Sequence, residues 1–405
     1  MRTTEVNCGT QLRISAIPRL GLAIGAFASG FGPAAQAWTP PSSYMVNLPG
    51  PPFGVVMTPD QKCVFVSLAG LRNRMPMGIA VLGAAGDRWR LVREVPMPAP
   101  ATEMVLTHDG KVLIAAASDT LMIADVDRMT RGTRNPILQS FRGGAGNIYV
   151  NVTSDDRTLL VSEERAAAIM VVNLEKVRAG GSDATAIIGK IPVGDAPIAL
   201  TFSPDERWLY TTSEIAPRAW GWPAVLKPEG SMSGGLVPEG AVLVVDMTKA
   251  RSDPGHSVVA RVPAGGSPVR LALSSSGDRL FVTARNSNSV LVFDTEKLRS
   301  DPEHARVARV PVGSSPVPIA LVDGGRKLVV GNSDRFEATR GSVSTLSVID
   351  VDRVSEGAKA VLGSIRCGAF PRELRLSPDG RTLFLTNFLS QSLQIIRVEG
   401  DLATQ

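Results

Sequence analysis

A polar turn followed by an apolar run recurs along the chain, and this pattern predicts its secondary structure. The clearest copies are SPDERWLYTTS at 203–213 and SPDGRTLFLTN at 377–387. Looser copies are SSSGDRLFVTA at 274–284, VDGGRKLVVGN at 322–332 and TPDQKCVFVSL at 58–68. Pro, Asp and Gly supply the backbone angles that a tight turn needs. Each copy is therefore predicted to be a turn that leads into a β-strand.

The spacing of the copies indicates a repeat protein. Counting the residue six positions before each turn gives seven copies. These positions are Pro52, Ala101, Asn147, Pro197, Pro268, Pro316 and Pro371. The spacing runs from about 46 to about 71 residues, and periods of this size are typical of solenoids and propellers.

The content of one repeat favours a propeller. The last repeat contains three β-type runs, ELRLS, TLFLTN and SLQIIRV, and the fifth adds a fourth, ARVARVPVG. A four-stranded sheet buries both faces when it packs between two like sheets, and closing the sheets in a ring removes long exposed edges. We therefore expect an all-β fold: a seven-bladed β-propeller of four-stranded antiparallel blades, with residues 38–405 as a single domain.

The two ends of this domain are expected to meet in one blade. The seventh repeat stops after its third strand, near Glu399, whereas YMVNLPG at 44–50 is a lone strand before the first repeat. The N-terminal strand is therefore expected to complete the last blade and to close the ring.

Residues 1–37 have the pattern of a secretory signal peptide. Three arginines precede or flank LGLAIGAFASGFG at 20–32, and Ala35-Gln36-Ala37 is a small-x-small cleavage sequence. The alternative is a short membrane anchor, but the apolar run is too short to span a bilayer as a helix. We expect cleavage after Ala37 and export to the periplasm or the extracellular space, with no integral membrane segment after cleavage.

The charge of the chain changes this picture little. Its 405 residues include 43 Lys and Arg against 38 Asp and Glu, a formal net charge of +5. The basic residues form no run, so no nucleic-acid surface is expected. Cys63 and Cys367 are interpreted as unbridged small apolar residues, and the propeller is expected to be a monomer.

Several repeats resemble the YVTN family of β-propeller repeats. The resemblance rests on IPVGDAPIALTFSPDERWLYTTS at 191–213 and VPVGSSPVPIALVDGGRKLVVGN at 310–332. Repeats four to seven match well, whereas HDG and SDD replace the PDG turn in two of the first three. The resemblance implies a propeller, but such propellers serve as surface layers, binding modules, enzyme subunits and lactonase-like hydrolases, so it does not select a function.

Polar residues at the start of the innermost strands are the candidate site. The second position of this strand is charged or aromatic in several repeats, and the end of the second strand adds further polar residues at the same end of the channel. The candidates are Glu103, Tyr149, Arg270, Arg372 and Glu373, followed by Glu163, Glu214, Arg285, Asn332 and Asn387. Mixed charge with Arg270 and Arg372 suits a small polar or anionic ligand. The alternative is a solvated channel lined by mutually paired charges.

The fourth repeat carries an insertion at 215–240 that contains Trp220 and Trp222. Long loops without secondary structure are usually functional or mobile. Both rings either pack back on the fourth blade or form a lid or partner contact at the channel mouth.

No cofactor or metal is expected. His108, His256 and His304 all fall in turns on the face opposite the candidate site, so a Ser-His-Asp triad or a histidine metal site has no histidine there. The chain contains no CxxC, CxxCH, HExxH or GxxxxGK[ST] motif. Asp246, Asp294 and Asp350 recur after the third strand and are expected to cap the turn that follows.

Three functions remain open from the sequence. The first is an exported binding module whose unknown small polar ligand or protein partner contacts the channel mouth. The second is a lactonase- or lyase-type enzyme that uses channel-mouth carboxylates and arginines. The third is a component of a surface or an assembly.

Overall fold

The computed structural model describes residues 39–70, 77–180, 183–227, 236–335 and 337–398. Residues 38–405 form one compact unit. The expected signal peptide therefore lies outside the described residues. None of the helices that the structure describes is long and apolar enough to cross a membrane.

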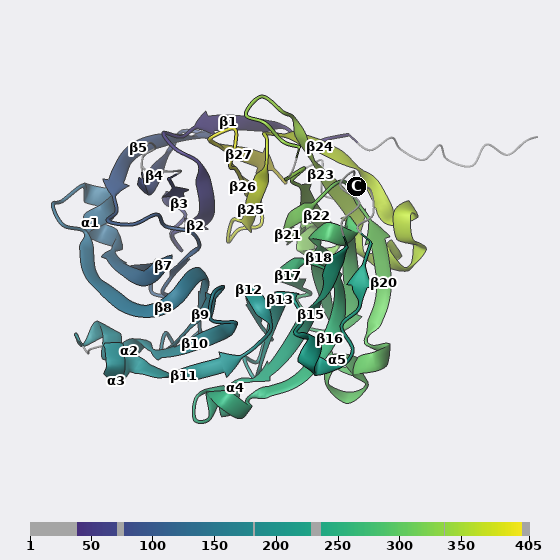
Figure 1. Ribbon diagram of the computed structural model, residues 1–405. Coiled ribbons are helices and arrows are strands. Elements are labelled where there is room, and N and C mark those ends of the chain that lie inside the picture. Colours follow the sequence, from purple (N-terminus) through teal and green to yellow (C-terminus); the bar gives the residue numbers. More distant parts are fainter. Residues whose placement is uncertain (1–38, 71–76, 181–182, 228–235, 336, 399–405) are drawn as a thin grey trace, which may run out of the picture. The chain divides into compact units, whose positions relative to one another are not determined.

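The described part of the chain is built almost entirely of antiparallel sheets that are arranged in a ring (Figure 1). The first sheet consists of β2 (Pro52–Met57), β3 (Cys63–Ala69), β4 (Met77–Ala85) and β5 (Arg88–Pro96). The second consists of β6 (Met104–Leu106), β7 (Val112–Asp125), β8 (Ile137–Val152), β9 (Thr158–Glu163), β10 (Ala168–Asn173) and β11 (Ile187–Pro192). The third consists of β12 (Asp195–Phe202), β13 (Trp208–Ile215), β14 (Val225–Leu226), β15 (Val237–Asp246) and β16 (Val258–Gly266).

Three four-stranded sheets complete the ring. The fourth consists of β17 (Pro268–Leu273), β18 (Arg279–Ala284), β19 (Ser289–Asp294) and β20 (Arg306–Pro311). The fifth consists of β21 (Pro316–Val322), β22 (Lys327–Asn332), β23 (Ser344–Asp350) and β24 (Val361–Cys367). The sixth consists of β25 (Pro371–Leu376), β26 (Thr382–Asn387), β27 (Ser392–Arg397) and β1 (Ser43–Asn47). The strands β2, β12, β17, β21 and β25 lie around the centre of the ring (Figure 1).

Short helices occupy the connections between strands. The α-helices are α1 (Val126–Arg131), α2 (Leu174–Arg178), α3 (Asp183–Ala186), α4 (Met247–Ala250) and α5 (Lys297–Ser300). The 3-10 helices are η1 (Arg218–Trp220), η2 (Pro254–His256), η3 (Arg285–Ser287), η4 (Pro302–His304), η5 (Asp323–Gly325) and η6 (Val351–Ala360). The carboxylates of Asp246, Asp294 and Asp350 accept backbone N–H bonds at the starts of these helical turns, as expected from their recurrence.

The all-β class is confirmed, but the expectation of seven separate four-stranded blades is wrong. The described residues form six sheets, because the second and third repeats share one six-stranded sheet. The first part of β7 pairs with β6, and its second part, Leu121–Ala124, pairs with β8. The 16-residue β8 in turn pairs with both β7 and β9. Ser118, in the left-handed region at φ 55°, follows the part of β7 paired with β6 and itself pairs with Asn147 of β8, and the strand does not end there.

The N-terminal strand closes the ring in the expected way. β1 pairs antiparallel with β27, with Ser43 opposite Ile396 and Asn47 opposite Ser392. The Gln394 amide donates to Ser43 Oγ at 3.0 Å. The sixth sheet therefore unites strands from both ends of the described chain.

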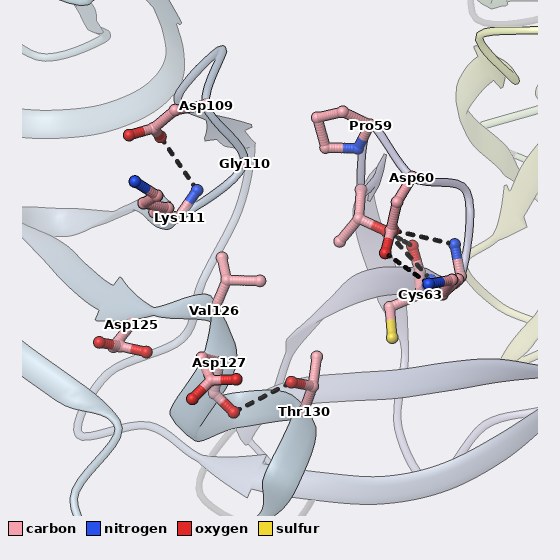
Figure 2. A pocket seen from close by; sticks show the side chains of 12 residues that line it. Pro59, Asp60, Cys63, Asp109, Gly110, Lys111, Asp125, Val126, Asp127 and Thr130 are labelled. Atoms are coloured by element: carbon pink, nitrogen blue, oxygen red, sulfur yellow. Dashed lines mark hydrogen bonds and ion pairs between the residues drawn. The ribbon is translucent and has the colours of Figure 1, made fainter.

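The recurring polar turn is a hydrogen-bonded unit. Ser377 Oγ donates to Asp379 Oδ1 at 2.5 Å, Asp379 accepts from the backbone N–H of Arg381, and the Thr382 N–H closes the turn on Ser377 Oγ. Figure 2 shows Asp60 and Asp109 in the first two copies of this turn. The copies at 58–60, 107–109, 153–155, 203–205 and 377–379 have a hydroxyl residue two positions before an aspartate, and together the two side chains satisfy the backbone donors of a tight turn.

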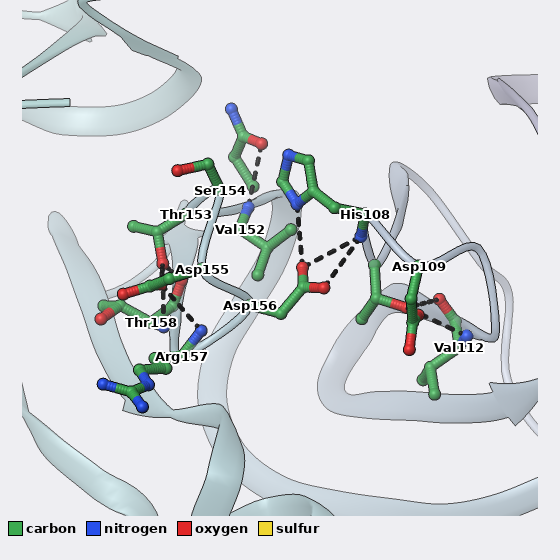
Figure 3. Close-up of polar contacts among 12 residues, drawn as sticks. His108, Asp109, Val112, Val152, Thr153, Ser154, Asp155, Asp156, Arg157 and Thr158 are labelled. Atoms are coloured by element: carbon green, nitrogen blue, oxygen red, sulfur yellow. Dashed lines mark hydrogen bonds and ion pairs between the residues drawn. The ribbon is translucent and has the colours of Figure 1, made fainter. Parts of the chain in front are cut away.

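Neighbouring turns are also joined to one another around the ring. The backbone N–H of His108 donates to both carboxylate oxygens of Asp156 at 3.0 Å (Figure 3). The backbone N–H of Ser154 donates in the same way to Glu206 of the next turn at 2.7 Å. These bonds tie the inner edges of successive repeats together.

The core lies between the faces of neighbouring sheets. Central strands such as β9 and β22 are buried along their whole length because both of their faces are covered. Phe281, Phe293 and Phe384 are fully buried. Cys63 and Cys367 are unbridged, and Cys367 packs in the core between the fifth and sixth sheets.

Candidate functional site

An ion pair links two strands that line the channel. Arg270 Nε on β17 donates to Glu373 Oε2 on β25 at 2.9 Å, and both side chains are buried. Arg270 also stacks over the ring of Tyr149, with its guanidinium carbon 5.1 Å from the ring centre. The structure thus brings together Arg270, Glu373 and Tyr149, which are all candidates from the sequence. Arg270 and Glu373 are mutually paired charges, as in the alternative interpretation.

Glu103 lies near this pair as a buried carboxyl group without a hydrogen-bond donor among the described residues. Its side chain is fully buried, and neither carboxylate oxygen accepts a hydrogen bond within the described part of the chain. Among the described residues it forms an ion pair with Arg375, whose Nη2 lies 3.8 Å from Glu103 Oε1. Burial, followed by the negative charge of Glu373, raises the pKa of Glu103 to about 8. Glu103 is therefore largely a neutral carboxylic acid at neutral pH.

Arg375 was not predicted, although a simple signal points to it. Residues two positions apart on a strand face the same side, so Arg375 shares the channel side of β25 with Glu373. Burial acts to lower the pKa of Arg375, but Tyr149, Glu373 and Glu103 together raise it. Its side chain is 42% exposed, and its Nε–H has no hydrogen-bond acceptor among the described residues. Arg375 is thus the cation of this group that solvent can reach.

A cavity of about 400 Å³ opens beside these residues. Its polar lining includes Tyr149, Asn151, Glu373 and Arg375. Its apolar lining comes mainly from the last residues of the inner strands, among them Met57, Leu106, Leu200, Phe202, Leu271, Ile319 and Leu376. The cavity therefore lies toward the end of the channel that carries the Pro-Asp-Gly turns, whereas the sequence placed the candidate site at the end where the inner strands begin.

A second polar cluster occupies the end of the channel where the inner strands begin. Arg285 forms a two-pronged ion pair with Glu214, at 3.2 and 2.6 Å. Arg372 stacks over Phe53 at 4.2 Å and over Phe370 at 5.6 Å. Burial, and then the positive charges of Arg270, Arg335 and Arg285, lower the pKa of Arg372 to about 9. We call this group, together with Glu164 and Arg335, the mouth cluster.

The other predicted residues from the ends of second strands lie inside the sheets. Glu163 is fully buried and pairs with Lys190 at 2.8 Å. The amide of Asn332 donates to Thr345 and Ser347, both at 3.0 Å. Asn387 is likewise buried and hydrogen-bonds Ser392 and Gln394, both at 3.4 Å. These three side chains hold strands together and do not join either polar cluster.

The tryptophans of the insertion contact their own sheet. The rings of Trp220 and Trp222 lie 5.8 Å apart, and Arg261 on β16 stacks over Trp220 at 5.2 Å. Both rings pack against the core between the second and third sheets. These contacts favour the alternative in which the insertion packs back on the fourth repeat, while residues 228–235 of the insertion lie outside the described residues.

The histidines and the aspartate-rich turns have structural roles. His256 and His304 make the same contact with an aspartate three residues earlier, at 3.0 Å. A cavity of about 630 Å³ between the first two repeats contains several aspartates, but Asp60, Asp109 and Asp125 already accept bonds from their own turns and from α1 (Figure 2). Among the described residues, no group of three or more His, Cys, Asp or Glu side chains is arranged to hold a metal ion.

Comparison with known proteins identifies the fold. No protein-family model matches the chain, and no curated protein matches its sequence. The structure is similar to that of hydrazine synthase from Kuenenia stuttgartiensis, with a TM-score of 0.63 and 18% identity, covering 91% of this chain and 99% of that one. It is also similar to a chain of a mitotic checkpoint complex, with a TM-score of 0.62 and 16% identity, covering 93% and 99%. At these identities the likeness shows a β-propeller fold and nothing about activity.

Proposed function

We propose that this chain is an exported β-propeller that binds a small anionic ligand with an apolar body in its central channel. The observation that supports this is the side chain of Arg375, which is 42% exposed and lines a cavity with both polar and apolar walls. The cavity of about 400 Å³ lies within the usual range of small-molecule pockets, which runs from about 300 to 1,000 Å³.

The charges around the cavity favour an anion. Arg270 is neutralised by Glu373 at 2.9 Å. The carboxyl of Glu103, which pairs with Arg375, has a pKa of about 8 and is therefore mostly protonated at neutral pH. Arg375 therefore carries a positive charge that its neighbours do not fully neutralise at neutral pH. A carboxylate is the ligand group that a guanidinium binds best through paired hydrogen bonds.

The apolar walls select the rest of the ligand. Leucine, isoleucine, methionine and phenylalanine residues form part of the lining of the cavity, beside Arg375. Burying a hydrocarbon body against them contributes about 25 cal/mol per Å² of apolar surface removed from water. A medium-chain carboxylate combines both features.

The test is calorimetric titration of the protein with octanoate, with the neutral octanamide as the comparison ligand. We expect octanoate to bind and Arg375→Gln to weaken it at least about tenfold, the loss of one charge-assisted hydrogen bond. Arg375→Lys should recover part of the affinity because it keeps the charge. Arg353→Gln and the double change His256→Ala with His304→Ala, all at exposed sites, should leave binding unchanged. Equal affinity for octanamide, or no effect of Arg375→Gln, would contradict the proposal.

The proposal includes export and membership of the YVTN repeat family. Export is supported by the pattern of residues 1–37, and the family by the phrases at 191–213 and 310–332. Mass spectrometry of the protein from its native host should find Trp38 as the first residue. An intact chain that begins at Met1 in the cytoplasm would contradict export.

A lactonase- or lyase-type activity is the second candidate, and one observation favours it. A carboxyl with a pKa of about 8 beside a second carboxylate is a typical general acid or base. Against it, Glu103 does not line the cavity, and Glu373, which does, is paired with Arg270. Assays with alkyl lactones on the wild type and on Glu103→Gln decide the matter: turnover that Glu103→Gln abolishes would favour the enzyme.

A further inference from the structure

The mouth cluster contains an arginine, Arg372, that stacks on two aromatic rings and forms no ion pair with a described residue. Arg372 lies against Phe53 and Phe370, and Phe370 packs edge-on against Phe388 at 5.5 Å. The described part of the chain gives Arg372 no ion pair, and its Nε–H is buried without a hydrogen-bond acceptor. Aromatic stacking fixes the plane of a guanidinium while it leaves the N–H edge available.

The cluster as a whole carries more positive than negative charge. Arg285 and Glu214 neutralise each other, and Arg285 Nε–H is likewise buried without an acceptor. Among the described residues of the cluster, the remaining carboxyl beside Arg335 and Arg372 is that of Glu164. Desolvation, followed by the charge of Glu214, raises the pKa of Glu164.

The same arginines disturb one another. Desolvation and the charge of Arg285 lower the pKa of Arg335, and burial together with Arg270, Arg335 and Arg285 lowers that of Arg372. Guanidinium groups that repel one another are stabilised when an anion binds between them.

We propose that the mouth cluster is a second binding site, which takes a small oxyanion, a phosphate or a carboxylate group, between Arg372 and Arg335. Arg285, fixed by Glu214, supplies a further N–H at its edge. Oxyanions suit these side chains because a guanidinium offers two parallel donors to two oxygens.

This site is distinct from the one proposed at Arg375. The Arg270–Glu373 ion pair is buried in the channel wall, while the lining of the cavity beside Arg375 includes none of the mouth cluster. Arg372 lies on β25, the strand that also carries Arg375, whereas Arg285 and Arg335 follow the second strands of the fourth and fifth sheets. Arg335→Gln therefore tests the mouth site without changing β25.

The test is calorimetric titration with inorganic phosphate and, separately, with acetate at low ionic strength, where exposed charges are least screened. At least one of the two anions should bind at concentrations up to about 20 mM, and Arg372→Gln should weaken it at least about tenfold. Binding of phosphate alone, of acetate alone or of both anions shows which oxyanion the site prefers.

Two further variants make the result decisive. Arg335 is exposed, so Arg335→Gln is expected to fold even if Arg372→Gln does not, and it should weaken the same anion at least about threefold. Arg375→Gln should leave this binding unchanged, and Arg335→Gln should leave octanoate binding unchanged. No binding of either anion, or binding that neither Arg335→Gln nor Arg372→Gln weakens, would overturn the proposal.

Discussion

Arg270 and Glu373 are 103 positions apart in the chain, yet their side chains meet at 2.9 Å in the channel wall. Their side chains are only 5% and 6% exposed. The pair joins the fourth sheet to the sixth, and the fifth sheet lies between them along the chain. It is therefore a direct link across the centre of the ring.

Removing one member of this pair should destabilise the fold strongly. Glu373→Gln leaves the guanidinium of Arg270 buried without a counter-ion, which we expect to cost about 3–5 kcal/mol in the free energy of unfolding. Urea denaturation of the purified variant measures this.

The matched control is the exposed pair Arg353–Glu356, whose members meet at 2.8 Å. Arg353→Gln should cost less than about 1 kcal/mol, because exposed ion pairs contribute little. The double change Arg270→Met with Glu373→Leu should recover most of the stability lost by Glu373→Gln. Similar losses at the buried and the exposed pair would show that the buried pair has no special role.

Glu103 should make both stability and ligand affinity depend on pH. Its pKa is raised from an ordinary value of 4.5 to about 8 in the folded protein. The protonated carboxyl therefore contributes stability that is fully present below pH 4.5 and is lost as the pH rises through about 8. Glu103→Gln should remove this slope and raise the melting temperature at pH 9 by at least about 2 °C.

The same titration should weaken anion binding. Above pH 8 an ionised Glu103 neutralises Arg375, so the affinity for octanoate should fall between pH 7 and 9 in the wild type and stay constant in Glu103→Gln. If the affinity for octanoate depended on pH in the same way in both proteins, Glu103 would not be the group that controls it.

The repeated turn should contribute to stability in acid. The hydroxyl of Ser203, followed by the backbone N–H of Arg207, lowers the pKa of Asp205 below its ordinary 3.8. Such a carboxylate contributes stability that is present above the ordinary pKa and is lost as the pH falls through the lowered one. Ser203→Ala should raise the pKa of Asp205, measured by NMR titration, and cost about 1 kcal/mol at pH 7. Ser252→Ala, at an exposed hydroxyl outside these turns, is the control and should change neither quantity.

The N-terminal strand should be essential to the sixth sheet. Deleting residues 39–49 leaves the edge of β27 unpaired and removes Tyr44, whose hydroxyl accepts the backbone N–H of Trp89 at 2.8 Å. We expect a loss of several kcal/mol in the free energy of unfolding, about 1.5–3 of it for each large apolar side chain that is no longer buried. Met45→Ala, at a 49% exposed position of the same strand, should be nearly neutral. Unchanged thermal stability of the deletion variant would contradict the closure.

The sequence predicted the repeating turn, the β class and the closing strand because each depends on local pattern. The number of sheets depends on whether the hydrogen-bonded pairing of strands is interrupted within residues 112–152. A serine such as Ser118 can adopt a left-handed conformation without ending a strand, so the two degenerate repeats gave no sign of a continuous sheet.

The candidate site was predicted only in part for a related reason. Position in the repeat placed Arg270 and Glu373 in the channel correctly, since the inner strand repeats regularly. Position in the repeat could not predict that Glu214 pairs with Arg285 whereas Glu163 pairs with Lys190. The partner of each carboxylate depends on which strand presents the nearest opposite charge. Arg375 was missed because attention stopped at the strand starts and did not extend two residues further along β25.

The pairing of β1 with β27 also determines when the protein can complete its fold during synthesis. Ser43 and its partner Gln394 are 351 positions apart. A ribosome that adds about 5–20 residues per second needs roughly 20 to 70 seconds to make the second after the first. Until then the nascent chain is an open arc of sheets whose first strand has no partner, so a message cut short before β27 yields a ring that cannot close. The joint between β1 and β27 thus couples completion of translation to completion of the fold.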